Sequence, residues 1–209
     1  MKKWFFIRYN DPTPHIRFRI ELRDQNMYVK VVSEINKVLG KFVESEQISK
    51  ISFDTYSREI ERYTLHCMEK SEELFYIESE LVLKIIKNAK SNLERWKKAF
   101  EYIVSILNQA GLQLVEKKDF CERMFELYHN EFGNDQGIII HFNQKFKELK
   151  FFFKTLEDNS CSSELFVELC SIQHEIFSKT KSTNAPQKSS EITNKLLSSY
   201  IHMFLNRNL

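Results

Sequence analysis

The sequence predicts a single α+β domain, with a small antiparallel β-sheet near the N-terminus packed by several α-helices. Short β-type runs, in which apolar residues alternate with polar ones, lie in the first 56 residues, and beyond them apolar residues recur at helical intervals of three and four. The chain also has only 4 Gly and 3 Pro among 209 residues, few for a loop-rich β-sandwich. We therefore expect one domain, residues 1–209, with a mostly helical C-terminal two-thirds.

Two runs near the N-terminus have the composition of β-strands. Residues 4–9 and 15–22 are joined by an Asn-Asp-Pro-Thr-Pro segment, whose residues favour a tight connection. In the second run apolar and polar residues alternate, so that Arg17 and Arg19 share the polar face. The pattern predicts an opening hairpin with an unusually cationic face.

Helical spacing of apolar residues predicts a first helix over residues 28–43. Residues 48–56 follow, where Ile51, Phe53 and Thr55 alternate with polar residues as in a third strand. Further helices are predicted at residues 71–88, 93–109, 118–131, 138–156, 163–178 and 191–206.

The last helix and the segment before it differ sharply in pattern. Residues 179–190, KTKSTNAPQKSS, are polar, contain a proline and have no apolar period, so we expect a mobile surface loop there. Residues 191–206 carry a broad apolar stripe that must be buried. We expect this helix to pack against the opening sheet.

Composition excludes several classes of protein. With 31 Lys+Arg and 29 Asp+Glu the formal charge is +2, so no direct nucleic acid binding is expected. No stretch approaches the roughly 20 apolar residues of a membrane helix, and the N-terminus lacks the apolar core of a signal peptide, which together predict a cytoplasmic protein without a membrane partner.

The cysteines have no pattern that points to chemistry. They are widely spaced, without a CxxC pair or a histidine at metal-ligand spacing, so we expect no metal and no disulfide framework. Buried, reduced thiols are the favoured interpretation. The four residues are Cys67, Cys121, Cys161 and Cys170.

Three separated segments carry motifs of one known family. The first is WFFIRY at residues 4–9, followed by Asp-Pro and by HIRFR at residues 15–19. The second is YSREIERY at residues 56–63, and the third is His-Met with Asn-Arg at residues 202–207. In this order they resemble the C-terminal domains of lantibiotic dehydratases, which also occur alone as thiopeptide-type bacteriocin biosynthesis proteins.

The chain departs from that family in three ways. Thr64-Leu65 stands where the family has Gly-Gly, so we expect a turn that can use positive φ in the family to be built differently here. Glu78-Ser79 stands where Asp-Ser is common, and the middle of the chain looks shorter. These changes bear on the shape of the substrate site.

The resemblance implies a lyase that completes the dehydration of Ser or Thr in a ribosomal precursor peptide. In the family, a separate domain or protein transfers glutamate from glutamyl-tRNA to the side-chain hydroxyl. The elimination domain then removes the Cα proton and expels glutamate, leaving dehydroalanine or dehydrobutyrine. The implied partners are the precursor peptide, with its leader and glutamylated core, and a separate glutamyl-tRNA-dependent protein. A homodimer is possible, and no cofactor is implied.

The resemblance also implies which residues act. A fixed guanidinium stabilises the enolate formed when the Cα proton leaves, and an Arg fork binds the departing carboxylate. We expect Arg17 and Arg62 to bind anions, Glu59 to position an arginine or assist proton transfer, and Asn206 to orient a proton-transfer histidine. The catalytic set carried over from the family is Arg17, Arg19, Glu59, Arg62 and His202.

Other interpretations of the same residues stay open. Without the resemblance, these charges would form a solvated, salt-bridged surface, and Arg58 and Glu61 are expected to form structural ion pairs. One alternative function is pyridine synthesis from two dehydroalanines in thiopeptides, although a cycloaddition has no glutamate to bind. The other is a non-catalytic leader-binding or scaffolding protein that captures a peptide at a strand edge.

Overall fold

The computed structural model describes residues 2–132, 136–155, 164–183 and 185–209. Within these residues the sheet has two antiparallel strands, β1 (Trp4–Tyr9) and β2 (His15–Ile20). Their register pairs Trp4 with Ile20 at one end and Tyr9 with His15 at the other. The connection between the strands contains a cis Asp11–Pro12 bond. The predicted hairpin is therefore confirmed.

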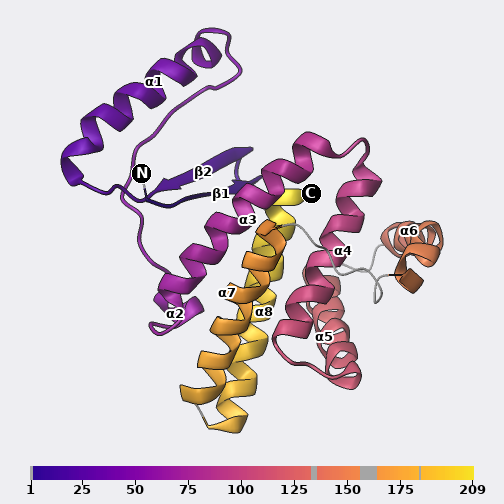
Figure 1. Ribbon diagram of the computed structural model, residues 1–209. Coiled ribbons are helices and arrows are strands. Elements are labelled where there is room, and N and C mark those ends of the chain that lie inside the picture. The colour runs from indigo at the N-terminus through magenta and orange to yellow at the C-terminus, as the bar shows by residue number, and fades with distance from the viewer. Residues whose placement is uncertain (1, 133–135, 156–163, 184) are drawn as a thin grey trace.

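Helices make up most of the remaining chain (Figure 1). A short 3-10 helix, η1 (Gln25–Met27), leads into the first α-helix. The α-helices are α1 (Tyr28–Glu44), α2 (Ile60–Tyr63), α3 (Met68–Asn88), α4 (Asn92–Gln109), α5 (Leu114–Phe132), α6 (Gln136–Thr155), α7 (Glu164–Thr183) and α8 (Pro186–Asn208). The predicted class, a small N-terminal sheet packed by helices, is confirmed.

The core forms where α3, α4, α7 and α8 pack against one another. Its centre is aromatic: Tyr200 of α8 stacks on Tyr63 of α2 at 5.5 Å and meets the edge of Phe75 of α3 at 6.1 Å. One turn later, Phe204 stacks on Tyr102 of α4. Because α8 contacts α2, α3, α4 and α7, this last helix lies at the middle of the fold.

The C-terminal end of α8 docks on β1, as the sequence predicts. The Arg207 Nε donates to the Phe6 carbonyl at 2.6 Å, and the Arg8 amide donates to Asn206 Oδ1 at 3.0 Å. The Phe6 amide in turn donates to Ser79 Oγ of α3 at 3.4 Å. The outer edge of β1 is thus covered by side chains from α3 and α8.

Two predicted elements are wrong. Residues 48–56 form no strand, because they run from α1 to α2 without a neighbouring strand to pair with. The predicted loop at 179–190 is mostly helical: α7 continues to Thr183, and α8 begins at Pro186, whose fixed φ suits the first turn of a helix. The predicted helix ends at 156 and 163 lie outside the described residues.

The cysteines differ in burial. Cys67 is buried, whereas Cys170 is half-buried and Cys121 is exposed, so the expectation that all the thiols are buried is wrong. Cys161 lies outside the described residues.

None of the helices in the described ranges combines the length and hydropathy needed to span a membrane.

Candidate functional site

Arg17 has an exposed side chain on β2. Its guanidinium carbon is 4.1 Å from the centre of the Tyr9 ring, and its Nε donates to His15 Nε2 at 3.3 Å. The other nitrogen of His15, Nδ1, lies 2.8 Å from the Thr13 carbonyl. Nδ1 must therefore carry the hydrogen, and His15 serves the turn and Arg17. This arrangement holds the arginine side chain in a defined direction at the surface.

Arg19 lies two residues further along the same face. Its guanidinium carbon is 5.1 Å from the Tyr56 ring and 5.6 Å from the Phe5 ring, and its buried Nη1 has no hydrogen-bond partner. Burial raises the pKa of Tyr56 to about 12, so this residue offers a neutral ring to the cation. The Nη1 group of Arg19 can therefore still donate a hydrogen bond, and Arg19 lies on the same strand face as Arg17.

Glu59 and Arg62 form the second group, at the start of α2. Arg62 Nη1 lies 3.2 Å from Glu59 Oε2, and both side chains are about half exposed, at 49% and 43%. The short helix puts these residues, three apart, on neighbouring positions, because the amides of Arg62 and Tyr63 both donate to the Glu59 carbonyl. The pair is therefore positioned by backbone geometry and open to solvent.

The charged residues between them have structural roles. Arg58 donates from Nε and Nη2 to both carboxylate oxygens of Glu72, at 2.8 and 2.6 Å, and Glu72 is buried. This confirms Arg58 as a structural ion-pair residue. The Glu61 backbone carbonyl accepts a hydrogen bond from Lys195 Nζ at 2.8 Å. This hydrogen bond joins α2 to α8.

His202 lies on an exposed face of α8 that is turned toward α5. Its Nδ1 is 3.5 Å from the Tyr128 hydroxyl of α5, whereas Asn206, one turn later, accepts from the Arg8 amide of β1. The structure thus places Arg17 and Arg19 on one strand face, and it places Glu59 beside Arg62. The contacts described for His202 are with α5, and those for Asn206 are with β1.

A buried charge cluster was missed by the sequence reasoning. Glu78 Oε2 and Arg207 Nη1 lie 2.6 Å apart with both side chains fully buried, and the Tyr102 hydroxyl donates to Glu78 Oε1. Burial raises the pKa of Glu78 to about 7, against the opposing effects of Arg207 and Tyr102. Two signals were present: Glu78 departs from the family's Asp, and Arg207 ends the third motif.

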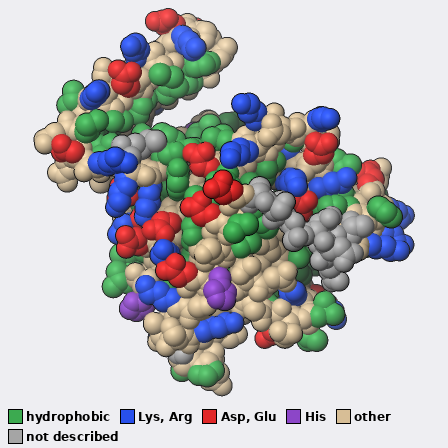
Figure 2. Space-filling model, in the orientation of Figure 1, with side chains coloured by type: hydrophobic (Ala, Val, Ile, Leu, Met, Phe, Trp, Pro, Cys, Tyr) green, Lys and Arg blue, Asp and Glu red, His purple; other side chains and the backbone are tan. Residues whose placement is uncertain are grey.

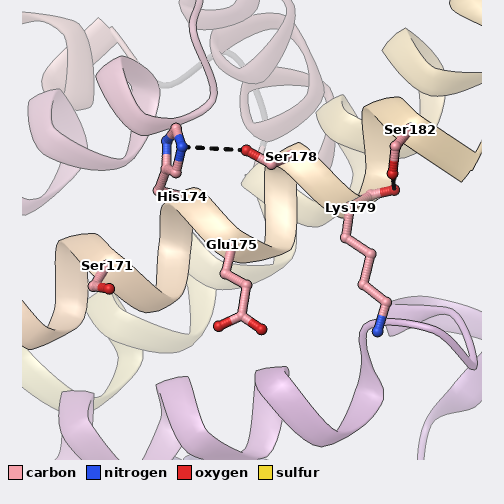
Figure 3. A pocket seen from close by; sticks show the side chains of 6 residues that line it. All are labelled: Ser171, His174, Glu175, Ser178, Lys179 and Ser182. Atoms are coloured by element: carbon pink, nitrogen blue, oxygen red, sulfur yellow. Dashed lines mark hydrogen bonds between the residues drawn. The ribbon is translucent and has the colours of Figure 1, made fainter.

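A polar hollow also runs along the outer face of α7 (Figure 3). His174 Nε2 lies 3.3 Å from Ser178 Oγ, and Glu175 pairs with Lys70 of α3 at 3.0 Å. The lining residues are Ser171, His174, Glu175, Ser178, Lys179 and Ser182. Because none of the residues assigned by the motifs lines it, this hollow belongs to a different part of the surface.

Comparison with protein families gives one match over the whole chain. Residues 1–209 match the family described as "Lantibiotic biosynthesis dehydratase C-term". The subtilin biosynthesis protein SpaB of Bacillus subtilis is 32% identical over 142 residues, 65% of this chain. The nisin biosynthesis protein NisB of Lactococcus lactis subsp. lactis is 29% identical over 171 residues, 73% of this chain.

A solved structure has the same fold. The crystal structure of the tRNA dependent lantibiotic dehydratase MibB from Microbispora sp. 107891 is similar over 100% of this chain, with a TM-score of 0.68 and 17% sequence identity. The matched regions make up only 14% of SpaB, 17% of NisB and 23% of the MibB chain. The chain therefore corresponds to a small part of each of these larger proteins.

Proposed function

Because the chain belongs to the family of lantibiotic dehydratase C-terminal domains, we propose that it eliminates glutamate from glutamylated Ser or Thr residues of a ribosomal precursor peptide. A base removes the Cα proton, and the electron pair of that bond forms the Cα–Cβ double bond. The Cβ–O bond breaks, and glutamate leaves with its electron pair as a carboxylate. The product is dehydroalanine from Ser or dehydrobutyrine from Thr.

The observation that carries this proposal is a contrast among the arginines of the three motifs. Arg58 and Arg207 are each bound to a buried carboxylate, which fixes them in structural roles. Arg17 has an exposed side chain, and Arg62 is half exposed beside Glu59. Arg17 and Arg62, the arginines assigned to anion binding, thus have charges that are accessible to a substrate, as does Arg8 of the first motif.

The residues would divide the chemistry as follows. Arg17 and Arg19 bind the substrate's glutamyl carboxylate, for which a guanidinium fork is well suited. Arg62, held by Glu59, stabilises the negative charge that develops on the amide oxygen as the Cα proton leaves. His202 carries the proton.

The substrate must come from a glutamylating reaction. We propose that a separate glutamyl-tRNA-dependent protein supplies the glutamyl ester on the precursor peptide, because elimination domains of this family act on an ester that a separate domain or protein has formed. Both proteins would bind the leader of the same precursor peptide.

A second candidate function is a non-catalytic, peptide-binding member of the family. It is favoured by the contact of His202 with Tyr128, which lies on α5, a helix that carries none of the assigned site residues. Such a protein would bind the glutamylated peptide and leave the ester intact.

The two candidates are separated by one assay on a synthetic peptide that carries a glutamyl ester on serine. We expect the purified chain alone to release free glutamate, measured by chromatography, and to leave the same peptide without the ester unchanged. Binding of the ester peptide without release would support the second candidate. Dehydration of the unmodified peptide, without tRNA or a partner, would contradict the proposed division of labour.

A further inference from the structure

The outer edge of β2 carries backbone groups that face away from the hairpin. The Phe6 amide and carbonyl bond to Ser79 and Arg207, so they point away from β2. Phe6 is opposite Phe18 in the register, so the amide and carbonyl of Phe18 point away from β1, as do those of Ile16. No strand among the described residues pairs with this edge. It can therefore accept another strand.

The two faces of β2 beside this edge differ in chemistry. Arg17 and Arg19 lie on one face, and the Arg17 side chain is exposed. The ring of Tyr56 lies 5.1 Å from the Arg19 guanidinium carbon, so the second motif begins beside this cationic face. The other face carries Ile16 and Phe18, which are 67% and 51% exposed. The helix that follows, α1, projects from the body of the protein (Figure 2) and buries neither of them.

Charge decides which kind of strand fits the edge. If the β2 strands of two copies paired across a two-fold axis at Phe18, Arg17 of each copy would lie opposite Arg19 of the other. Like charges directly opposite each other destabilise a sheet. A peptide with a glutamyl carboxylate at this position would instead bring a negative charge to the two arginines. The edge therefore favours the glutamylated peptide over a second copy.

We propose that the glutamylated peptide adds to the outer edge of β2 as a parallel strand, with its modified residue beside Arg17. In this pairing the modified residue's amide donates to the Ile16 carbonyl, and its carbonyl accepts from the Phe18 amide. The glutamyl side chain lies on the face of Arg17 and Arg19. The inference rests on the proposed function and specifies how the substrate binds.

The chemistry of elimination selects the parallel direction. In any strand, a residue's own N–H and C=O point to one side and its Cα–H points to the other. A residue beside Arg17 in an antiparallel strand would form a pair without hydrogen bonds, in which the two Cα atoms are only about 4.5 Å apart. Its Cα–H would face β2, where a base cannot reach it. In a parallel strand the same residue bonds to β2, so its Cα–H faces away and is open to a base.

The parallel pairing also gives the Phe18 amide a part in the reaction. When a base takes the Cα proton, negative charge develops on the carbonyl oxygen of the modified residue, before the electron pair forms the double bond and glutamate leaves. The Phe18 amide donates to that same oxygen. Because the strand already holds this amide in place, it stabilises the charge without reorganisation. Arg62, proposed above for the same charge, would supply a second donor.

Methylation of single amide nitrogens of the substrate tests the pairing and its direction. The probe is a synthetic peptide with one glutamyl serine, and its affinity for the full chain is measured by fluorescence anisotropy. In the parallel register the amide two residues after the modified one donates to the Phe18 carbonyl, and the amide between them faces away. We expect methylation of the first amide to weaken binding about tenfold or more, and methylation of the second to have little effect.

The other outcomes of this scan are equally clear. The reverse pattern would mean an antiparallel strand, and equal effects at the two positions would mean that no strand forms at the edge; either result overturns the proposal. Glutamate release from the unmethylated peptide is measured separately. The expected binding pattern without release would contradict the proposed lyase and would support the strand pairing.

Two substitutions at one position test the Phe18 amide. Phe18→Pro removes the N–H and Phe18→Ala keeps it, while both remove the ring. Proline is compatible with an edge strand whose N–H faces outward, and circular dichroism checks that both variants fold. We expect Phe18→Pro to release glutamate about 10²–10³-fold more slowly than Phe18→Ala. Equal rates in the two folded variants would overturn the role of the amide. If Phe18→Pro does not fold, the methylation scan decides.

Sedimentation velocity of the full chain tests whether a second copy occupies the edge. We expect Phe18→Pro to leave the sedimentation coefficient unchanged, because the charges of Arg17 and Arg19 oppose pairing between copies. A parent dimer that this substitution converts to a monomer would assign the edge to a second copy and would overturn the proposal.

Discussion

The arginines of this chain differ in what surrounds their guanidinium groups. Arg207 is fully buried and bound to Glu78, and Arg58 clamps the buried Glu72. Removing either arginine would leave a buried carboxylate without its partner, which is strongly destabilising. Arg17 and Arg62 are not bound to a buried carboxylate, because their side chains are at the surface. Substitutions at the two kinds of position should therefore have opposite signatures.

Arg17→Ala and Arg62→Ala should each slow glutamate release by about 10²–10³-fold, because each removes one donor for an anion. Their thermal midpoints should stay near that of the parent protein. Arg58→Ala is the matched control, and we expect it to lower the midpoint clearly. Parent-like rates in both folded site variants would show that the assigned site is wrong.

Thr64 adopts a backbone conformation that normally belongs to glycine. Its φ is 60° and its ψ is 151°, a region in which a β-branched residue is strained by about 1–3 kcal/mol. The turn is thus built with the positive φ that the family's Gly-Gly allows, and the expectation of a different turn is wrong. Thr64→Gly should raise the free energy of unfolding by roughly 1 kcal/mol, measured by urea denaturation.

The neighbouring position provides the control for that prediction. Leu65 is 70% exposed and is not among the residues with positive φ in the described chain. Leu65→Gly should therefore lower the free energy of unfolding, since it only adds conformational freedom to the unfolded chain. Stabilisation by both glycines, or by neither, would contradict the strain at Thr64.

Glu78 should make stability depend on pH. Its pKa is raised from 4.5 to about 7 by burial, so between these values the folded protein holds a proton that the unfolded chain has lost. The stability contributed by this group therefore decreases as the pH rises from about 4.5 to about 7. In urea denaturation, Glu78→Gln should lack this part of the slope. If the free energy of unfolding had the same pH dependence in the two proteins, the raised pKa of Glu78 would be contradicted.

Individual residues were predictable from sequence when a motif fixed both their type and their spacing. Arg58 was expected in an ion pair because it lies between the residues carried over from the family. Arg17 and Arg19 were expected on one strand face because apolar and polar residues alternate there. The Glu78–Arg207 pair joins residues far apart in the sequence, so only the folded packing of α3 against α8 reveals it. The conformation of Thr64 was hidden because its residue type argues against positive φ.

At the scale of elements, α8 connects the two ends of the chain. Its apolar stripe is buried against α3, α4 and α7, and its last turn bonds to Phe6 and Arg8 of β1. His202 lies one turn before Asn206 on this helix, and its described contact is with Tyr128 of α5.

Deleting residues 200–209 should destabilise the domain and abolish glutamate release, because Tyr200 and Phe204 are completely buried. His202→Ala should abolish release with little change in the thermal midpoint, since this side chain is exposed. Circular dichroism melts and the glutamate assay measure both. A His202→Ala variant with parent activity would remove the proton carrier and favour the peptide-binding candidate.

Helices were predicted better than the segments between them. Apolar spacing located α4 almost to the residue, because α4 buries one continuous face. The segment 48–56 has a strand pattern, but a strand also needs a paired neighbour, which local pattern cannot supply. The polar segment 179–190 lacked an apolar period, yet it is helical on both sides of residue 184 because α7 and α8 extend beyond the core.

At the scale of the whole molecule, the three motifs converge from opposite ends of the chain. The N-terminal hairpin and α2 both pack on α3, and Asn206 and Arg207 at the end of α8 bond to β1 (Figure 1). The fold is shared with a part of MibB that makes up 23% of that chain. We propose that the chain carries out the elimination step and that a separate protein carries out the glutamylation.

The measurement that tests this account most directly follows the Cα hydrogen of the substrate. The purified chain is incubated with a peptide whose glutamylated serine carries deuterium at Cα, and the peptide product is analysed by mass spectrometry. Elimination predicts a product that contains dehydroalanine and has lost both the deuterium and the glutamate. Release of glutamate with return of deuterated serine would mean ester hydrolysis, and an unchanged ester would mean binding alone; either result contradicts the proposed lyase.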